Sequence, residues 1–402
     1  MTKHTHSLSS NVDELLGRGV AQIIVRESVA EKLSTGKKLR IKLGVDPTAP
    51  HLHLGHAVIL RKMRAFQERG HKVIFLVGDF TARIGDPTDQ QNARKQLTEQ
   101  DVARNMASYV SEAGKILDIK KTEIRYNSEW LQRMDFAEIF DLTSLFSVQR
   151  MLERDMFEKR MKQGHPIWLH EFLYPVMQGY DSVALKADLE FGGTDQTFNV
   201  LAARTIQPHY SQDPQDIITF ELLEGTDGKR KMSMSIGNTI NLVDSPDEMY
   251  GKTMAIPDTL IVRYFLLATD VPEREISQFE QEMKKGANPK KYKERLATEL
   301  VTIYHGKSHA IRAAAAFTKV FKDKKIPDVI PEKAVHDSSY QLIDFLVALK
   351  LTPSKSEARR LIQQGAVSVD SKVMNNWQAT VTVRSGMIVK VGKRKFVKVQ
   401  KV

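Results

Sequence analysis

Short apolar runs alternate with longer amphipathic stretches through about the first 230 residues of the chain. Residues 39–45 alternate apolar and polar side chains, as a half-buried strand does. Residues 55–69 carry apolar side chains at helical spacing and end at Gly70, a typical helix stop. Residues 72–78 are a continuous apolar run after their lysine, and residues 123–126 predict a further short strand. This order predicts a doubly wound parallel α/β sheet, which binds ligands beyond the carboxyl ends of its strands.

The pattern becomes helical beyond Pro246. Residues 273–284 and 291–318 are rich in charged residues and alanine, with helical spacing and few strand signals. Residues 322–331 are charged and contain two prolines, as a linker between domains does. A small all-α domain is therefore predicted to follow the α/β sheet.

The C-terminal segment has a mixed pattern. Residues 340–350 predict an amphipathic helix, and residues 354–364 predict a second, basic helix that ends at Gly365. Four short β-like segments follow, over residues 366–369, 379–383, 387–391 and 395–399. The whole pattern predicts three domains, over residues 1–245, 246–330 and 336–402.

Composition points to a polyanionic partner and to a cytoplasmic protein. The 402 residues carry a formal net charge of +11, with a pI near 9.4, which suits binding to a nucleic acid. The chain has no cysteine, so it forms no disulfide and no thiolate metal site. Its polar N-terminus precedes no apolar segment of signal-peptide type. No run approaches about 18 uncharged apolar residues, the length that a membrane span needs.

The first candidate for chemistry is the run from Gly44 to His56, which contains His-Leu-Gly-His and follows the first predicted strand. Gly44 lets a ligand approach the backbone closely, and Gly55 opens a helix whose N-terminal amides favour phosphate. His53 and His56 lie on one side of the first turn, where imidazoles can donate to phosphate oxygens. Two other interpretations stay open. One is a capped turn with surface histidines, and the other is a metal site of His51, His53 and His56, for which no further ligand set is evident.

The second candidate is Lys231-Met232-Ser233-Met234-Ser235, in a turn rich in glycine and lysine over residues 225–235. Glycines make such a loop mobile, and lysine ammonium groups can neutralise leaving pyrophosphate. Taken alone, a turn of this kind is most often a solvated loop. Neither motif has the Gly-x-x-x-x-Gly-Lys shape of a P-loop. Their occurrence together, in this order and on an α/β chain, predicts an enzyme that uses ATP.

The two motifs resemble the HIGH and KMSKS signatures of class I aminoacyl-tRNA synthetases. Nearly the whole chain resembles the tyrosyl-tRNA synthetase family, in its bacterial subgroup with a His-x-Gly-His signature and a C-terminal S4-like domain. The other segments that carry the resemblance are Ile84–Pro87, Glu171–Ser182 and Gly192–Gln196. The resemblance implies a Rossmann-like catalytic domain, a helical anticodon-binding domain and an α+β S4-like RNA-binding domain.

The activity that this resemblance implies has two steps. L-Tyrosine reacts with ATP to give tyrosyl-adenylate and pyrophosphate, and the tyrosyl group then passes to the 3′-terminal ribose of tRNA(Tyr). No covalent enzyme intermediate is needed, so catalysis consists of positioning and charge stabilisation in the transition state.

Tyr174, Gln178 and Asp181 recur at a spacing that puts all three on one face of a helix. A face that carries a phenol, an amide and a carboxylate makes a poor hydrophobic core. The resemblance assigns Asp181 to the substrate phenol, and Tyr174, Gln178 and Asp86 to the substrate α-ammonium group. It places Gln196 near the tyrosyl carboxyl group. Bound phenylalanine would leave the Asp181 carboxylate buried and unpaired.

The resemblance also implies residues for ATP and for catalysis. The ATP-binding residues are Gly44, Asp46, His53, Gly55, His56, Gly193, Asp195, Lys231, Met232, Ser233 and Ser235. The catalytic residues are His53, His56, Thr48, Lys231 and Arg94, the last of them on a polar loop from which it can reach pyrophosphate. Mg²⁺ accompanies ATP, held mostly by phosphates and water, and no metal site of the protein's own is expected.

Two positions depart from the family pattern. Met234 occupies the place of the second lysine of the KMSKS signature, so one mobile cation is missing and Lys229 or Arg230 is the candidate substitute. Lys42 occupies a place where many family members have a tyrosine that shares the substrate hydroxyl. The second partner of the substrate phenol is therefore not identified by the sequence.

The tail carries the predicted contacts with RNA. Lys355, Arg359 and Arg360 crowd one helix in a segment, residues 354–367, that resembles the core of S4-type RNA-binding domains. Such cations bind phosphates without reading sequence. The family is homodimeric, and we expect the contact between subunits around residues 128–151.

Three other functions remain possible from the sequence. One is a tryptophan-specific class I synthetase, against which Tyr174, Asp181 and the S4-like tail speak. Another is a pantothenate-synthetase-like nucleotidyltransferase, which would not need the helical domain and the tail. The third is a non-catalytic RNA-binding paralogue, which Met234 suggests and the complete set of tyrosine-binding residues opposes.

Overall fold

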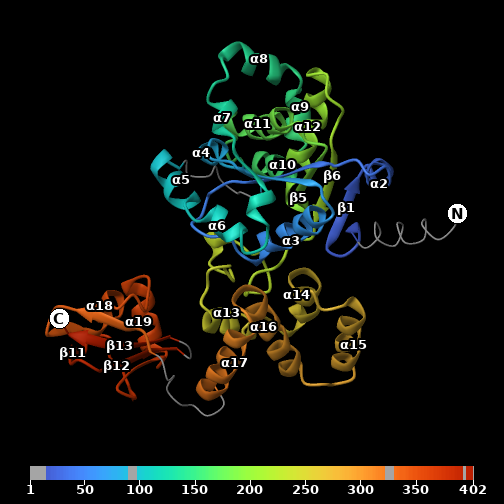
Figure 1. Cartoon of the computed structure of the whole chain (residues 1–402). Helices are drawn as coiled ribbons and strands as arrows, with labels where there is room; N and C mark the ends of the chain where they lie inside the picture. Colours follow the sequence, from blue (N-terminus) through green and yellow to red (C-terminus); the bar gives the residue numbers. More distant parts are fainter. Residues whose placement is uncertain (1–14, 89–96, 322–329, 393–394, 402) are drawn as a thin grey trace. The chain divides into compact units, whose positions relative to one another are not determined.

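The computed structural model describes residues 15–88, 97–321, 330–392 and 395–401 (Figure 1). They form two compact units. The first consists of residues up to 245 together with 252–304, and the second of residues 246–251 together with those from 305 onward. Within the described part of the chain, no helix is both long enough and apolar enough to cross a membrane.

The first unit contains a six-stranded sheet with the order β1-β6-β5-β2-β3-β4. Its strands are β1 Val20–Ile24, β2 Arg40–Val45, β3 Lys72–Val77, β4 Glu123–Tyr126, β5 Leu189–Gly193 and β6 Asp216–Phe220. The edge strand β1 is antiparallel to β6, and the remaining neighbours pair in parallel. The predicted parallel α/β sheet is confirmed, and the three strands whose ranges were predicted correspond to β2, β3 and β4. The carboxyl ends of β2, β3 and β5 lie at one edge of the sheet, where such folds bind ligands.

Helices surround this sheet (Figure 1). In the N-terminal half they are α2 Arg26–Ser34, α3 Leu54–Glu68, α4 Thr81–Ile84, α5 Glu99–Met106, α6 Tyr109–Ala113, α7 Ser128–Leu131, α8 Phe136–Ser144, α9 Val148–Leu152, α10 Asp155–Lys162, α11 Leu169–Leu185 and α12 Thr197–His209. Further helices follow along the chain and are not part of the group around this sheet, with α17 in the second unit. They are α13 Pro246–Met254, α14 Ile261–Ala268, α15 Glu273–Lys284, α16 Pro289–His305 and α17 Lys307–Phe321. Short 3₁₀ turns lie at Ile119–Lys121, Thr194–Gln196, Met234–Ile236 and Asp258–Leu260.

An aromatic cluster fixes helix α3 on the sheet. Phe66 of α3 meets Phe191 of β5 edge to face at 5.3 Å, and Phe191 meets Phe220 of β6 at 5.0 Å. All three rings are fully buried. Because α3 begins at the end of β2, this packing holds the N-terminus of the helix over the carboxyl edge of the sheet.

Helices α11 and α12 pack against each other. Their closest approach is at Gly179 of α11, where a Cβ atom would lie 2.7 Å from the Ile206 side chain and 3.0 Å from the Ala203 amide nitrogen. Only glycine fits at this distance, so a side chain here would push the helices apart. The position of α11 matters because it carries the predicted tyrosine-binding face.

One predicted helical stretch, residues 291–318, is two helices in the structure. The chain breaks between α16 and α17 at Gly306, which has a φ of +87°. Glycine adopts this left-handed conformation without steric cost and ends helices for that reason. The other stretch predicted in this region, residues 273–284, coincides with α15.

The second unit ends in a small α+β fold. Its helices are α18 Leu342–Ala348 and α19 Lys355–Gln363, and its strands are β7 Glu332–Val335, β8 Ser339–Gln341, β9 Val367–Val369, β10 Lys372–Val373, β11 Thr380–Thr382, β12 Ile388–Val391 and β13 Lys395–Lys401. One sheet has the order β10-β9-β12-β13-β7, and β11 pairs with β8. Leu342, Phe345 and Ile362 of the two helices belong to its buried apolar core.

The sequence pattern predicts both helices of this fold and four of its strands. It does not predict β7, β8 or β10. Strands β8 and β10 have only three and two residues, and β8 takes Tyr340 and Gln341 from the start of the predicted helix 340–350. Strand β7 has four residues with two charges at the edge of a sheet, which leave little hydrophobic signal. The strand pairs in parallel with β13, and it lies next to the predicted linker. Most of that linker, residues 322–329, lies outside the described residues.

Candidate active site

A cavity of about 490 Å³ opens at the carboxyl edge of the six-stranded sheet. This is an ordinary size for a small-molecule site. It brings together every described residue that the sequence analysis assigned to ATP, tyrosine or catalysis. They are Gly44, Asp46, Thr48, His53, Gly55, His56, Asp86, Tyr174, Gln178, Asp181, Gly193, Asp195, Gln196, Lys231, Met232, Ser233 and Ser235. Arg94 lies outside the described residues.

The two histidines of the first motif cap helix α3 reciprocally. His53 precedes the helix, and its Nδ1 accepts a hydrogen bond from the Gly55 amide at 3.2 Å. The His53 amide in turn donates to Nδ1 of His56 at 3.2 Å. Because a backbone N–H can only donate, both Nδ1 atoms are acceptors and each neutral ring carries its proton on Nε2.

Both imidazoles are neutral at neutral pH. Burial lowers the pKa of His56 to about 4, and burial together with the neighbouring His56 ring holds the pKa of His53 well below its ordinary value. Two neutral N–H donors beside the N-terminus of a helix suit phosphate oxygens. The capped turn that was the alternative is present, but its histidines are not exposed on the surface. Phosphate binding by the same two rings stays a prediction.

The loop before these histidines is held by one buried carboxylate. Glu112 of α6 accepts hydrogen bonds from the Leu52 amide at 2.7 Å and from Ser108 at 2.6 Å. Its other close contact is Nδ1 of His51, at 2.9 Å. His51 is thus paired with a carboxylate that the sequence did not point to. Within the described residues, no group of three or more side chains is placed to hold a metal ion.

The predicted tyrosine-binding face lies on α11, and two of its side chains are buried against the sheet edge. The Tyr174 hydroxyl donates to Oδ2 of Asp46 at 2.9 Å, and Thr81 donates to the other oxygen of that carboxylate at 2.8 Å. Burial and the nearby Asp46 raise the pKa of Tyr174 well above its ordinary value. Tyr174 is therefore a fixed phenol, one turn before Gln178.

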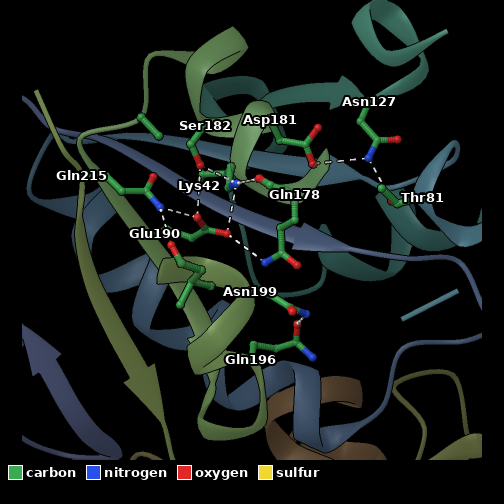
Figure 2. A network of polar contacts seen from close by, with 12 residues as sticks. Lys42, Thr81, Asn127, Gln178, Asp181, Ser182, Glu190, Gln196, Asn199 and Gln215 are labelled. Carbon is green, nitrogen blue, oxygen red and sulfur yellow. Dashed lines mark hydrogen bonds and ion pairs between the residues drawn. The ribbon is translucent and has the colours of Figure 1, made fainter. Parts of the chain in front are cut away.

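Asp181 is the most perturbed carboxylate of the cavity. Its Oδ1 accepts from Nε1 of Trp130 at 2.8 Å. Its Oδ2 accepts from the amide of Asn127 at 3.3 Å, as Figure 2 shows. Burial raises the pKa of Asp181 to about 7, against the opposing effects of Lys42 and the two donors. Asp181 thus exchanges its proton near neutral pH.

Asp86 receives a different set of donors. Gln196 donates to its Oδ2 at 2.7 Å, and Thr88 and Asn199 donate to its Oδ1 at 2.7 and 3.3 Å. The guanidinium group of Arg154 lies 3.9 Å away and is almost wholly buried. Asp86 therefore presents a carboxylate with ordered donors at the wall of the cavity, where a cation of the ligand can pair with it.

Lys42 does not line the cavity. Its ammonium group is fully buried beneath it, 3.0 Å from the carboxylate of Glu190. It also donates to the Ser182 hydroxyl at 2.7 Å and to the main-chain oxygen of Gln178 at 3.1 Å (Figure 2). Lys42, which departs from the family pattern, therefore lies behind the pocket and not in its wall.

The second motif is organised by Asn238. Its side chain donates to Asp227 at 3.1 Å and to the main-chain oxygen of Lys231 at 3.2 Å, and it accepts from the Ser233 amide at 2.8 Å. The neighbouring Gly225 leaves room for it, since a Cβ there would lie 2.1 Å from the Asn238 amide. The hydrogen bonds of Asn238 therefore fix the conformation of the turn.

The cations of this turn differ in direction. Lys231 reaches into the cavity and pairs with Asp195 at 2.5 Å, whereas Arg230 pairs with Asp227 at 3.2 Å and is exposed. Neither Lys229 nor Arg230 lines the cavity, while Met234 does. The sulfur of Met234 accepts a hydrogen bond from Thr239 at 3.3 Å. In this arrangement no second lysine of the motif faces the cavity.

Several residues of the site could not be assigned from the sequence. Asn127 lies directly after the predicted strand β4, and Thr81 lies just past β3, so their places at strand ends were available signals. Trp130 and Glu190 had no such signal, because only the fold brings them to Asp181 and Lys42.

The three predicted RNA-binding cations lie on or beside α19. Lys355 pairs with Asp344 at 2.6 Å, Arg360 pairs with Glu357 at 2.5 Å, and the guanidinium of Arg359 stacks on Trp377 at 4.4 Å. These ion pairs are exposed, so each costs little to exchange for a phosphate.

The chain matches two family models and many characterised proteins. The model for tRNA synthetases class I (W and Y) covers residues 34–322, and the model for the tyrosine–tRNA ligase SYY-like C-terminal domain covers residues 322–399. The chain is 48% identical over 387 residues to the tyrosine–tRNA ligase of Thermotoga maritima, covering 96% of each chain. It is 48% identical over 400 residues to that of Carboxydothermus hydrogenoformans, covering 96% of this chain and 97% of the other.

Solved structures agree with these matches. A C-terminally truncated mitochondrial tyrosyl-tRNA synthetase of Aspergillus nidulans has a TM-score of 0.64 and 26% identity, over 77% of this chain and 94% of that one. The tyrosyl-tRNA synthetase of Archaeoglobus fulgidus, solved with L-tyrosine, has a TM-score of 0.62 over 76% of this chain and 99% of that one. At 22% identity, the second likeness concerns the fold alone.

Replacement of Glu112 by alanine should loosen the loop of the first motif. The substitution removes the acceptor of the buried Leu52 amide, at a cost of about 1–3 kcal/mol. We expect the Leu52 amide to exchange its hydrogen roughly ten- to a hundredfold faster in hydrogen-exchange mass spectrometry of the loop peptide. Glu99→Ala, which removes an exposed carboxylate of α5, is the control. Unchanged protection of the loop would show that Glu112 does not hold it.

Proposed function

The chain belongs to the class I tyrosyl-tRNA synthetases, and we propose from the geometry of its cavity how each group takes part in joining tyrosine to tRNA. The enzyme uses ATP, tyrosine and tRNA as substrates. The tyrosine carboxylate attacks the α-phosphorus of ATP and releases pyrophosphate, and the terminal ribose of tRNA then attacks the acyl carbon. One observation carries the proposal: a buried carboxylate, Asp181, shares a cavity with the capped histidines of α3.

Asp181 accepts the phenolic hydrogen bond of the substrate. Trp130 and Asn127 hold its two oxygens in place, so the carboxylate meets the phenol without reorienting. Phenylalanine would place an apolar ring edge against this carboxylate and supply no hydrogen bond beyond those from Trp130 and Asn127. A site built to bind a hydroxyl rejects the analogue that lacks it. Tyrosyl-tRNA synthetases are themselves the standard illustration of this rule.

The other end of the amino acid is held by acceptors. Asp86, Tyr174 and Gln178 surround the α-ammonium group, and Gln196, hydrogen-bonded to Asp86, lies by the carboxyl group that attacks ATP. Asp86 already accepts four hydrogen bonds, from the amide and hydroxyl of Thr88, from Asn199 and from Gln196. Because a carboxylate can accept about four, the ammonium ion takes the place of one of these donors, and the long bond from Asn199 is the weakest of them.

ATP lies between the two motifs. Gly44 and Asp46 face the adenylate, Gly193 and Asp195 face its ribose, and Gly55 leaves the helix N-terminus open. A Cβ at Gly193 would lie 2.5 Å from the Asp195 carboxylate and would displace that side chain from its place beside the ribose. The neutral histidines, Thr48, Lys231 and the main chain of the second motif meet the triphosphate.

Arg94 remains a predicted pyrophosphate contact outside the described residues. Mg²⁺ arrives with ATP, bound by phosphates and water, and neutralises their charge.

The C-terminal fold binds tRNA through Lys355, Arg359 and Arg360. We retain the division into a catalytic domain of residues 1–245, a helical anticodon-binding domain of 246–330 and an S4-like domain of 336–402. An enzyme with these substrates is expected in the cytoplasm.

A homodimer is supported by an apolar surface within residues 128–151. Phe136, Phe140 and Val148 have exposed fractions of 83%, 69% and 66%. Exposed apolar side chains gathered on one segment mark an interaction surface in a soluble protein.

The protein should catalyse ATP–pyrophosphate exchange with tyrosine, and not with phenylalanine or tryptophan. Asp181→Asn should lower kcat/KM for tyrosine by about 10- to 100-fold, the value of a hydrogen bond to a charged group. The same variant should leave the very low kcat/KM for phenylalanine almost unchanged. The ratio of kcat/KM for tyrosine to that for phenylalanine should therefore fall. Exchange with tryptophan alone would assign the pocket to the sister specificity. RNA binding without any exchange would support the non-catalytic paralogue.

Met234→Lys should accelerate tyrosine activation. It restores a second cation facing the cavity, where it can neutralise charge on the leaving pyrophosphate. We expect kcat for exchange to rise by about tenfold, the effect of roughly 1.4 kcal/mol in the transition state. Met234→Leu, which adds no charge, should not gain activity. Equal rates for the lysine variant and the parent would refute the idea that Met234 weakens the contact of the second motif with pyrophosphate.

Phe140→Asp should separate the subunits. A charge placed in an apolar contact is desolvated without a partner, which weakens association strongly. Sedimentation velocity at micromolar concentration should show a dimer for the parent and a monomer for the variant. Ile311→Asp, at an exposed apolar position of α17, is the control. A monomeric parent would contradict the proposed interface.

A further inference from the structure

We propose that the buried ion pair of Lys42 and Glu190 is a positioning device for tyrosine binding, which fixes the orientation of the Gln178 side chain so that its oxygen faces the substrate ammonium group. The inference rests on the proposed function, because it takes Gln178 as a ligand of that ammonium. Lys42 and Glu190 would act through Gln178 and would not touch the substrate.

The pair lies in the middle of the sheet. Lys42 of β2 and Glu190 of β5 are direct cross-strand partners, and their charged groups are 3.0 Å apart with exposed fractions of 0% and 1%. Central parallel strands ordinarily carry apolar side chains here. Removing two charges from water costs several kcal/mol per ion, and an apolar pair of similar volume is often at least as stable. The pair therefore calls for a role other than stability.

Both members of the pair hold the same residue of α11. Lys42 donates to the main-chain oxygen of Gln178 at 3.1 Å, and the Gln178 side-chain amide donates to Oε1 of Glu190 at 3.2 Å. Ser182, one turn further along, bridges the two: it accepts from Lys42 at 2.7 Å and donates to Glu190 at 3.1 Å. Gln215 donates to the same Glu190 carboxylate.

This arrangement selects one orientation of the Gln178 amide. A carboxylate can only accept, so Glu190 must bind the NH₂ group of Gln178, and the carbonyl oxygen points the other way (Figure 2). Gln178 lines the cavity, whereas neither Lys42 nor Glu190 does. An ammonium group needs an acceptor, and the flipped amide would present a donor instead. The pair thus decides whether Gln178 attracts or repels the substrate.

The same pair affects Asp181. Lys42 favours the charged form of this carboxylate and Glu190 opposes it, so the two charges move its pKa in opposite directions. The other groups that face Asp181 are the donors Trp130 and Asn127, which favour its charged form. A single substitution in the pair therefore has a signed effect on Asp181 in addition to its effect on Gln178.

The decisive variant is the double substitution Lys42→Met and Glu190→Met, assayed by tyrosine-dependent ATP–pyrophosphate exchange. It removes both charges while keeping apolar volume, so the sheet should fold. We expect KM for tyrosine to rise at least about tenfold, while KM for ATP stays within about twofold, because Gln178 is free to flip. Lys32→Met with Asp216→Asn, which removes a partly buried ion pair between helix α2 and strand β6, away from the cavity, should change neither value.

A folded double variant with the parent's KM for tyrosine would overturn the proposal and leave the pair a structural element. If the double variant does not fold, Glu190→Gln keeps the shape of the network. It should raise KM for tyrosine and move the acid limb of kcat/KM to lower pH, whereas Lys42→Met should move it to higher pH. If the pH profiles of kcat/KM for these two variants do not shift, or shift in the same direction, the proposal is also overturned. Absence of exchange in the parent would instead refute the proposed function.

Discussion

The site depends on burying carboxylates at the carboxyl edge of a parallel sheet without leaving any of them unpaired. The partly buried Asp46 and Asp86 and the buried Asp181 line the cavity at this edge, and Glu190 is buried behind it. An isolated buried charge would cost far more than a folded domain can offset. Each therefore has its own donors: a phenol and a hydroxyl for Asp46, amides for Asp86, an indole and an amide for Asp181, and an ammonium group for Glu190. These donors fix the shape of the pocket before any substrate arrives.

The two ends of the cavity are organised differently. At the tyrosine end, the groups are buried and bound to one another, which suits recognition of one side chain. At the triphosphate end, neutral histidines and helix amides supply donors without charge, and Lys231 supplies the cation from a turn pinned by Asn238. The loss of a lysine at Met234 falls on this end. In the proposed mechanism, selectivity for tyrosine and charge stabilisation on pyrophosphate therefore depend on separate groups.

The sequence predicts those parts of the site that depend on local spacing. Helical periodicity places Tyr174, Gln178 and Asp181 on one face, and the structure puts all three in the cavity. Lys42 could not be predicted in the same way. Within a strand of alternating pattern it looks like a solvent-facing residue, and only its pairing with Glu190, which is far away in the sequence, makes it internal. Trp130 also reaches Asp181 only through the fold, because strand order is a property of the whole chain. Asn127 differs, since its place directly after a predicted strand was a signal that the sequence offered. In the tail, β7 was missed because a short, charged edge strand has little pattern.

The central claim is that Asp181 accepts the substrate phenol as a charged carboxylate. Because the pKa of Asp181 is raised to about 7 by burial, part of the free enzyme carries a proton there that binding must expel. Isothermal titration calorimetry of tyrosine binding, in buffers of different ionisation enthalpy, measures that proton directly. The account predicts release of a fraction of a proton at pH 7, which shrinks as the pH rises to about 8.5 and disappears in Asp181→Asn. Binding with no proton exchange at pH 7, or with proton uptake, would contradict it.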